Sequence, residues 1–292
     1  MTIGEIGADV EEKDEKAQPK PSRSFRDAAF ALAWRTGLPN AGTIASRELG
    51  ALFVSPVGWV VAAVFTLVVS WFGFIGTAIG SQQATMEGVF SIITNFLMLV
   101  LIPLITMRVF AEERSQGTME LLLTAPVRDW ELAVGKWLGA FVFYVLLLAT
   151  TLVYIALLLY YAPVKTIVSV GGAQISIGAL DFGLIGATYV GLLLVGAAAT
   201  SIGVLASCVT KSQIVAFLLG LGVLLFVWYA GYLLGLFTQP PLSRFFQYVG
   251  GFNRYQTFSL GQLALKDTVY FASLTIAALF ITTRLLESRR WR

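Results

Sequence analysis

One polar stretch interrupts a chain that is otherwise strongly apolar, and it holds the residues whose types could do chemistry. The stretch runs from Arg108 to Lys136, and its first half carries the charged side chains Arg108, Glu112, Glu113, Arg114 and Glu120. A charged side chain costs a few kcal/mol in the centre of a bilayer. We therefore expect the stretch to lie in water, where its carboxylates and guanidinium groups can contact another protein.

Several kinds of catalysis are excluded by residue type. The chain has no histidine and a single cysteine, Cys208, which excludes histidine acid/base catalysis, histidine metal ligands and an internal disulfide. Gly135 and Lys136 superficially resemble the end of a phosphate-binding loop. However, Trp130 stands where that loop needs its first glycine, and Trp137 stands where it needs Ser or Thr. The chain is therefore not expected to hydrolyse ATP, and it is not expected to be an enzyme.

The apolar segments also lack the groups that a membrane-embedded enzyme or an ion-driven carrier needs. No Asp, Glu, Lys or Arg lies between Trp137 and Val164, between Phe182 and Thr210, or between Ser212 and Ser243. Ion-driven carriers use buried ionisable groups to couple a gradient to movement. Hydroxyl and amide side chains are present in these spans, but none has an acidic or basic partner to activate it. A gradient-driven carrier is disfavoured.

The second half of the polar stretch predicts a short helix. Thr124 can cap it, Pro126 is tolerated in its first turn, and Asp129 and Glu131 suit the positive end of a helix dipole. The expected helix covers about Ala125 to Leu132 and lies across the end of a membrane span.

These residues, in this order and spacing, resemble the signature of the second family of ABC-type transporter permeases, the ABC export permeases. The likeness runs from about Ala41 to the C-terminus and is closest to small six-span permeases of the gliding-motility and nitrous-oxide-reductase-maturation type. It implies that the short helix is a cytoplasmic coupling helix that contacts a separate ABC ATPase subunit. The residues expected to couple to the ATPase are Glu113, Arg114, Gly117, Thr118, Glu120, Ala125, Pro126, Val127, Arg128, Asp129 and Lys136.

The resemblance also implies the partners. ATP and Mg would be bound by the ATPase, with no cofactor in this chain. A second permease copy or a paralogue would complete the membrane part as a homodimer or heterodimer. The net charge of +3 is too small to indicate nucleic acid, and the remaining partner is membrane lipid.

Composition independently predicts an all-α polytopic membrane protein with six transmembrane helices. Hydrophobic residues make up 57% of the 292 residues and charged residues 13%, about half the charged share of an average soluble domain. Each apolar run reaches the roughly 20 residues that a bilayer requires. The predicted spans are Val57 to Ile79, Val89 to Met107 with a kink at Pro103, Leu132 to Tyr161, Leu180 to Cys208, Gln213 to Phe237, and Thr268 to Leu286.

Two segments precede the first span. Residues 1–40 combine clustered charges with prolines and are predicted to be a disordered cytoplasmic tail, ahead of a permease domain at 41–292. Asn40 can cap an amphipathic helix from Ala41 to Val54 that lies in the membrane surface, and Pro56 marks the break after it. The alternative is that this segment simply continues the first span.

The distribution of positive charge sets the orientation. Few lysines and arginines follow the first, third and fifth spans, and most occupy the other side of the membrane. By the positive-inside rule that other side is the cytoplasm, so both termini and the stretch from Arg108 to Lys136 are cytoplasmic. The expected location is the cell (inner, cytoplasmic) membrane.

The outer segment from Thr238 to Asp267 is aromatic and weakly charged. It resembles the re-entrant helices that the family places before its last span, and an interfacial aromatic belt is the alternative. Glycines at four-residue spacing, among them Gly135 with Gly139 and Gly231 with Gly235, allow helices to approach closely.

The function that fits all of this is the membrane-spanning permease subunit of an ATP-driven ABC transporter, exporting a substrate with energy from a separate ATPase. A gradient-independent channel or a structural membrane anchor without an ATPase would keep the topology. Either would leave the pattern from Glu113 to Lys136 unexplained.

Overall fold

The computed structural model describes residues 38–79, 86–119, 127–161, 166–170, 173–177, 181–237, 244, 246, 248 and 250–290. These all belong to the second of two compact units, Gly37–Arg292. The predicted tail therefore lies outside the described residues, except that helix α2 begins at Leu38 and takes in the last three of its residues.

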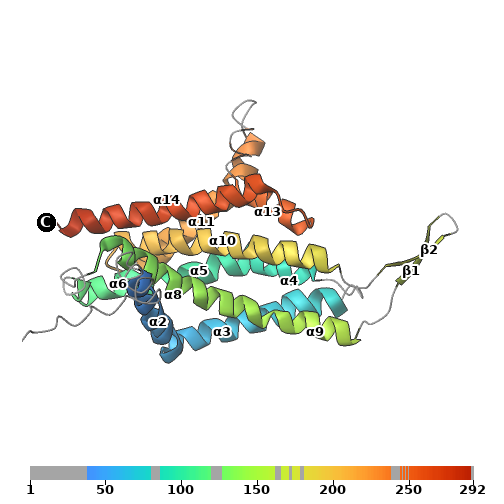
Figure 1. Ribbon diagram of the computed structural model, residues 1–292, viewed down its shortest axis with the longest axis horizontal. Helices are drawn as coiled ribbons and strands as arrows, with labels where there is room; N and C mark the ends of the chain where they lie inside the picture. The colour runs from blue at the N-terminus through green and yellow to red at the C-terminus, as the bar shows by residue number, and fades with distance from the viewer. Residues whose placement is uncertain are drawn as a thin grey trace, which may run out of the picture. The chain divides into compact units, whose positions relative to one another are not determined.

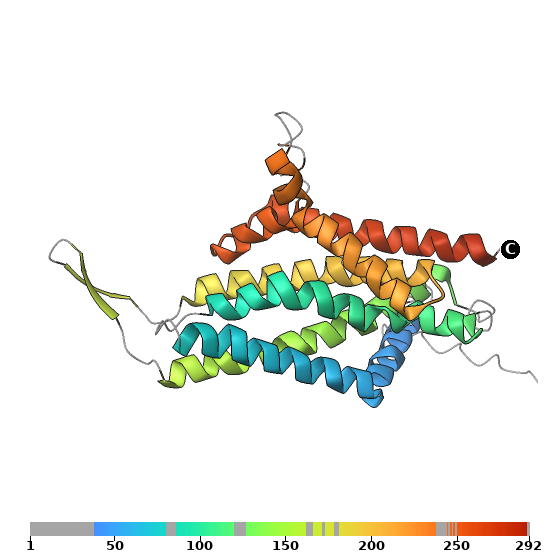
Figure 2. The ribbon, with the colours of Figure 1, turned by 180° about the vertical axis from the view of Figure 1, so that it is seen from behind.

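The helix predicted before the first span exists and is separate from that span. Helix α2 covers Leu38–Val54, helix α3 covers Pro56–Val68, and the first span continues as the π-helix η1, Val69–Ile79. Ser55 separates α2 from α3 because its hydroxyl accepts a hydrogen bond from the Val57 amide and Pro56 occupies the first helical position. Helix α2 crosses the end of α3 (Figure 2), so the alternative of a continuous span is wrong. Asn40 does not cap α2 but lies inside it.

The second span is bent, at a position other than the predicted one. It consists of α4 (Glu87–Ile92), the π-helix η2 (Ile93–Leu97), α5 (Met98–Thr106) and α6 (Arg108–Ser115). The two halves on either side of η2 are inclined by 49° to each other. A π-helical turn changes the direction of the chain in this way. Pro103, where a kink was predicted, lies inside α5, and its carbonyl accepts the Met107 amide at 2.8 Å.

The other spans follow the predicted order. The third consists of α8 (Asp129–Thr150) and α9 (Leu152–Tyr161), the fourth is α10 (Phe182–Val209), the fifth is α11 (Gln213–Phe237), and the sixth is α14 (Leu265–Arg290). Within the described residues five helices are long and apolar enough to cross a membrane, and the bent second span brings the number to six. The fold is helical and polytopic, as predicted.

Helix α10 lies at the centre of the bundle (Figure 1). It packs against α5, α6, α8, α11 and α14. Glycines allow this close packing: a β-carbon at Gly196 would lie 2.1 Å from the Tyr144 ring, and one at Gly203 would lie 2.1 Å from the Thr106 hydroxyl. The other spans leave large apolar side chains such as Trp59, Phe226 and Ile276 exposed on the outside, where lipid would cover them.

A short β-hairpin between the third and fourth spans was not predicted. Strands β1 (Thr166–Val170) and β2 (Ala173–Ile177) pair antiparallel, with Thr166 opposite Ile177 and Val170 opposite Ala173. The sequence contains the signal for it, because a Gly-Gly dipeptide separates two runs rich in β-branched residues.

Helix α13 (Gly251–Ser259) lies in the segment before the sixth span, where residues 244, 246 and 248 are helical as well. It packs against both α10 and α11. Phe258 on α13 contacts Gly191, about nine residues into α10, which at 1.5 Å per residue is roughly 13 Å along that helix. A helix at this depth fits the predicted re-entrant arrangement.

Candidate functional site

The polar stretch is built around two helix ends, those of α6 and α8. Helix α6 stops because Gly117 adopts the left-handed conformation, with φ of 73°, which other residues adopt only with strain. The Thr118 amide and hydroxyl both donate to the Glu113 carbonyl, at 3.0 and 3.2 Å. Gly117 and Thr118 thus have a structural role, which is to end the helix where the loop begins.

The start of α8 differs from the predicted short helix. Val127 and Arg128 are not helical, and α8 begins at Asp129 and continues directly into the third span. Among the described residues there is therefore no separate helix ending at Leu132. The other predicted coupling residues here, Glu120, Ala125 and Pro126, lie outside the described residues.

A buried carboxylate organises this end of α8. Glu131 is 2% exposed, and its Oε2 accepts hydrogen bonds from the Arg128 amide at 3.2 Å and from the Asn40 side chain at 3.0 Å. Asn40 binds this carboxylate instead of capping α2, which explains why the predicted cap is wrong. The Arg128 side chain is 65% exposed, and its Nε lies 3.9 Å from Glu131 Oε1.

Lys136 is the centre of the site. It lies two turns into α8, is 1% exposed, and contacts two carboxylates. Its Nζ donates to Glu48 on α2, to Glu113 Oε1 on α6 at 2.8 Å and to the Val109 carbonyl at 2.8 Å. These bonds use all three protons of the ammonium group. The Lys136 cluster, Glu48, Glu113 and Lys136, therefore joins α2, α6 and α8.

The cluster is electrostatically costly to disrupt. Its two carboxylates face one ammonium group, and Glu113 Oε2 is buried without a hydrogen-bond partner among the described residues. The Phe110 ring lies 5.2 Å from Nζ and adds a cation-π contact. Removing the single cation from such a site leaves buried negative charge uncompensated, which costs about 3–5 kcal/mol for a fully buried pair.

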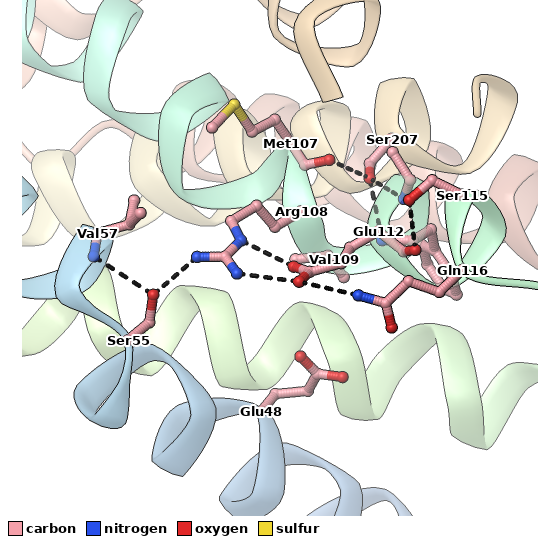
Figure 3. A network of polar contacts seen from close by, with 12 residues as sticks. Glu48, Ser55, Val57, Met107, Arg108, Val109, Glu112, Ser115, Gln116 and Ser207 are labelled. Atoms are coloured by element: carbon pink, nitrogen blue, oxygen red, sulfur yellow. Dashed lines mark hydrogen bonds and ion pairs between the residues drawn. The ribbon is translucent and has the colours of Figure 1, made fainter. Parts of the chain in front are cut away.

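A hydrogen bond from Arg108, which also forms an ion pair within α6, connects α6 to the corner between α2 and α3. Arg108 donates from Nε and NH2 to the two oxygens of Glu112, at 2.7 and 3.0 Å, and from NH1 to the Ser55 hydroxyl at 2.7 Å. Figure 3 shows Arg108 held between Ser55 and Glu112, with Glu48 projecting from α2 on the near side. A cavity of about 70 Å³ lies between these groups and the helices that carry them.

On its other side α6 is bonded to the end of α10. The Ser207 hydroxyl accepts the Phe110 and Ala111 amides, both at 3.0 Å, and donates to the Met107 carbonyl at 2.9 Å (Figure 3). Arg114 donates to the carbonyls of Cys208 and Thr210, both at 3.0 Å, and so caps α10. Helix α6 is thus held from both sides by side chains.

The structure brings together some of the predicted coupling residues and separates others. Glu113 and Lys136 meet, but inside the protein, and Arg114 faces α10. Sequence reasoning missed Glu48 and Ser207 as members of the site. A signal for Glu48 existed, since a lysine just inside an apolar span needs a buried acid as partner. For Ser207 there was none.

The arrangement consists of ion pairs and hydrogen bonds between helix ends. The described residues contain no set of three His, Cys, Asp or Glu side chains placed to hold a metal ion. Its polar contacts link four helices at the one end of the bundle from which the loop between α6 and α8 emerges.

Comparison with known proteins decides the family. The profile of the ABC-2 family transporter proteins matches residues 42–285. The chain belongs to the ABC-2 family. The match begins inside α2 and ends inside α14, so it includes all six spans and the Lys136 cluster. No curated protein matches the chain significantly. Members of the ABC-2 family are membrane permeases of ABC transporters, and they typically work with an ABC ATPase subunit, so this chain is a transport subunit of the membrane.

Proposed function

We propose that this ABC-2 permease exports a substrate across the cytoplasmic membrane and is driven by a separate ATPase subunit that binds the loop between α6 and α8. Two copies, or this chain and a paralogue, would enclose the pathway. The small six-span permeases of the gliding-motility and nitrous-oxide-reductase-maturation type are the subtype that its sequence resembles. Both termini would be cytoplasmic, since arginine and lysine concentrate on that side of the six spans.

The observation that supports this mechanism is the Lys136 cluster. Helices α6 and α8 flank the loop, and Lys136 bonds them to each other and to α2. Force applied to the loop should move α2, α6 and α8 together, because separating them would leave buried charges without a partner. The loop would therefore act on the ends of the second and third spans together, and on α2 at the membrane surface.

The exposed charge on the loop supports a docking role. Arg128 is 65% exposed and lies directly before α8, whereas the charges behind it are buried or half-buried. An exposed arginine at this position offers a partner a positive charge. The buried residues Glu113 and Lys136 would serve coupling by positioning the helices and not by touching the ATPase.

The experiment is to purify the permease with its ATPase and measure how strongly the permease stimulates ATP hydrolysis. Pro126→Gly and Arg128→Glu should each lower the stimulation severalfold while the protein still inserts. Arg284→Glu is the matched control, because Arg284 is 62% exposed and belongs to α14 and not to the residues that flank the loop. Full stimulation by both loop variants would contradict the proposal.

A further inference from the structure

At the end of the bundle opposite the Lys136 cluster, α13 is joined to α14 by a buried ion pair. Arg254 NH1 donates to Asp267 Oδ1 at 2.8 Å, and the side chains are 7% and 2% exposed. Thr257 donates to the other oxygen of Asp267, at 2.8 Å, and Arg254 Nε donates to the Tyr248 carbonyl, also at 2.8 Å. Both oxygens of the carboxylate are therefore bonded from α13.

Two aromatic rings enclose the guanidinium group. Its central carbon lies 4.1 Å from the centre of the Tyr248 ring and 4.5 Å from that of the Tyr270 ring on α14. The rings exclude water from the ion pair and stabilise the cation. Pulling α13 away from α14 would expose this pair and break several charged hydrogen bonds at once.

Hydrogen bonds also fix the turn between α13 and α14. Gly261 has φ of 78°, its amide donates to the Phe258 carbonyl at 2.9 Å, and the Gln262 amide donates to the Thr257 carbonyl at 3.0 Å. This is the glycine-terminated end typical of α-helices. Only residues 260–264 separate α13 from α14, so the connection is short.

The contacts of α13 with α10 and α11 are of another kind. They are apolar contacts. A β-carbon at Gly191 would lie 2.6 Å from Phe258, and one at Gly231 would lie 2.7 Å from Gly250. The rings of Trp228 and Tyr229 on α11 also contact those of Phe252 and Tyr255 on α13, with centroids 5.9 to 6.1 Å apart. No ion pair between described residues crosses this interface. The Thr188 hydroxyl reaches the Phe258 carbonyl only at 3.3 Å and also donates to its own helix.

The same interface is imperfectly filled. A small apolar cavity of about 20 Å³ lies between α5, α10, α11 and α14, and α13 reaches its wall at Gly251, beside Trp228. The Trp228 indole N–H is buried and has no hydrogen-bond partner among the described residues. A buried donor without a partner destabilises the closed packing. Separation along this interface would hydrate that N–H and would break no ion pair.

From this contrast we infer that α13 and the first turns of α14 form one rigid lid, locked by Arg254 and Asp267. The lid moves away from α11 when the permease opens to the outside. This inference rests on the proposed function, which supplies the outward opening. Arg254 and Asp267 are then positioning residues: they keep α13 attached to the sixth span while the contact with α11 opens.

Paired spin labels would test the inference on the purified permease and ATPase complex in nanodiscs, starting from Cys208→Ser. Leu260→Cys with Ile276→Cys reports within the lid, and Leu260→Cys with Phe226→Cys reports across the interface. All three positions are exposed, at 71%, 68% and 61%. When nucleotide is trapped on the ATPase, the second distance should shift by more than the width of its distribution. The first should not shift.

The ion pair is then removed. Asp267→Asn should make the distance within the lid respond to nucleotide and should lower coupled ATP hydrolysis at least tenfold. If that variant does not fold, the double variant Arg254→Gln with Asp267→Asn removes both charges, so that no buried charge is left without a partner. Glu287→Gln is the matched control on α14, because it breaks an exposed pair with Arg284; it should change neither distance.

Two results would overturn the lid. One is a nucleotide-dependent distance between Leu260 and Ile276 in the otherwise unchanged protein. The other is an unchanged distance between Leu260 and Phe226 while labels at Ser115→Cys and Ser288→Cys, at the cytoplasmic end, do respond. If the cytoplasmic labels do not respond either, and no ATPase copurifies, the proposed function is wrong, and the inference about the lid is wrong with it.

Discussion

Lys136→Met is the substitution that tests the site most directly. Methionine keeps the length and apolar stem of lysine but removes the only ammonium group that faces Glu48 and Glu113. The two carboxylates would then repel each other in a poorly hydrated site, and the Val109 carbonyl would lose its donor.

The magnitude follows from burial. Breaking a fully buried ion pair costs about 3–5 kcal/mol, because it strands a charge. The carboxylate side chains here are 21% and 19% exposed, so partial hydration puts the loss near the lower limit, about 3 kcal/mol. For a chain of this size that corresponds to a melting temperature lower by roughly 5 °C.

A compensated variant separates charge from packing. Glu48→Gln and Glu113→Gln combined with Lys136→Met removes all three charges, and replacing a buried ionic group by neutral groups of similar volume is often tolerated. The triple variant should therefore be more stable than Lys136→Met alone. Thermal unfolding of the permease in detergent measures both, with Arg284→Met as the exposed control, expected to cost about 0–1 kcal/mol. A single variant as stable as the natural protein, or a triple variant less stable than the single, would refute the reasoning.

Three further predictions concern the helix ends, the contact of α2 and the topology. Gly117→Ala should strain the left-handed turn, cost about 1 kcal/mol or more and reduce ATPase stimulation, whereas Gly186→Ala, inside α10 with open space around it, should do neither; ATPase assays of the complex compare the two. Gly139→Ala would place a β-carbon 2.6 Å from α2 and should lower the melting temperature, while Gly50→Ala, with nothing within 4 Å, should keep it or raise it slightly, because alanine favours the helix. On a Cys208→Ser background, an impermeant thiol reagent should label outer cysteines on intact cells and cytoplasmic ones only after lysis. The outer positions are Ser81, Ser169 and Ser243, the cytoplasmic ones are Ser115 and Ser288, and external labelling of Ser115→Cys would place the loop beyond reach of an ATPase.

The positions of the spans could be predicted from the sequence because the property that defines them is local. A run of about 20 apolar residues crosses a bilayer wherever it occurs, and α11 has the bounds that the sequence predicted, Gln213–Phe237. The break before the first span was predictable for the same reason, since Pro56 restricts its own neighbours. The family signature in the loop is also local, and the profile match agrees with it.

The partners within the site required the tertiary structure. Lys136 is 88 residues from Glu48 and 23 from Glu113, and Ser207 is 100 from Met107. Each contact depends on which helix faces meet, and hydropathy averaged along the chain does not contain that information. Exposed and buried charges also look identical in a sequence, so the sequence did not show that Glu113 and Lys136, two of the residues expected to couple to the ATPase, lie inside the protein.

The bend of the second span shows that a local sequence signal can also point to the wrong position. Pro103 carries the local signal for a kink, yet the direction changes at η2, Ile93–Leu97, where no proline or glycine lies. The sequence by itself thus determined how many spans the chain has and where the polar loop interrupts them, because burial in lipid acts on each segment separately. The tertiary structure decided which charges pair and where a span bends, because both depend on the packing of helices that are distant in the chain.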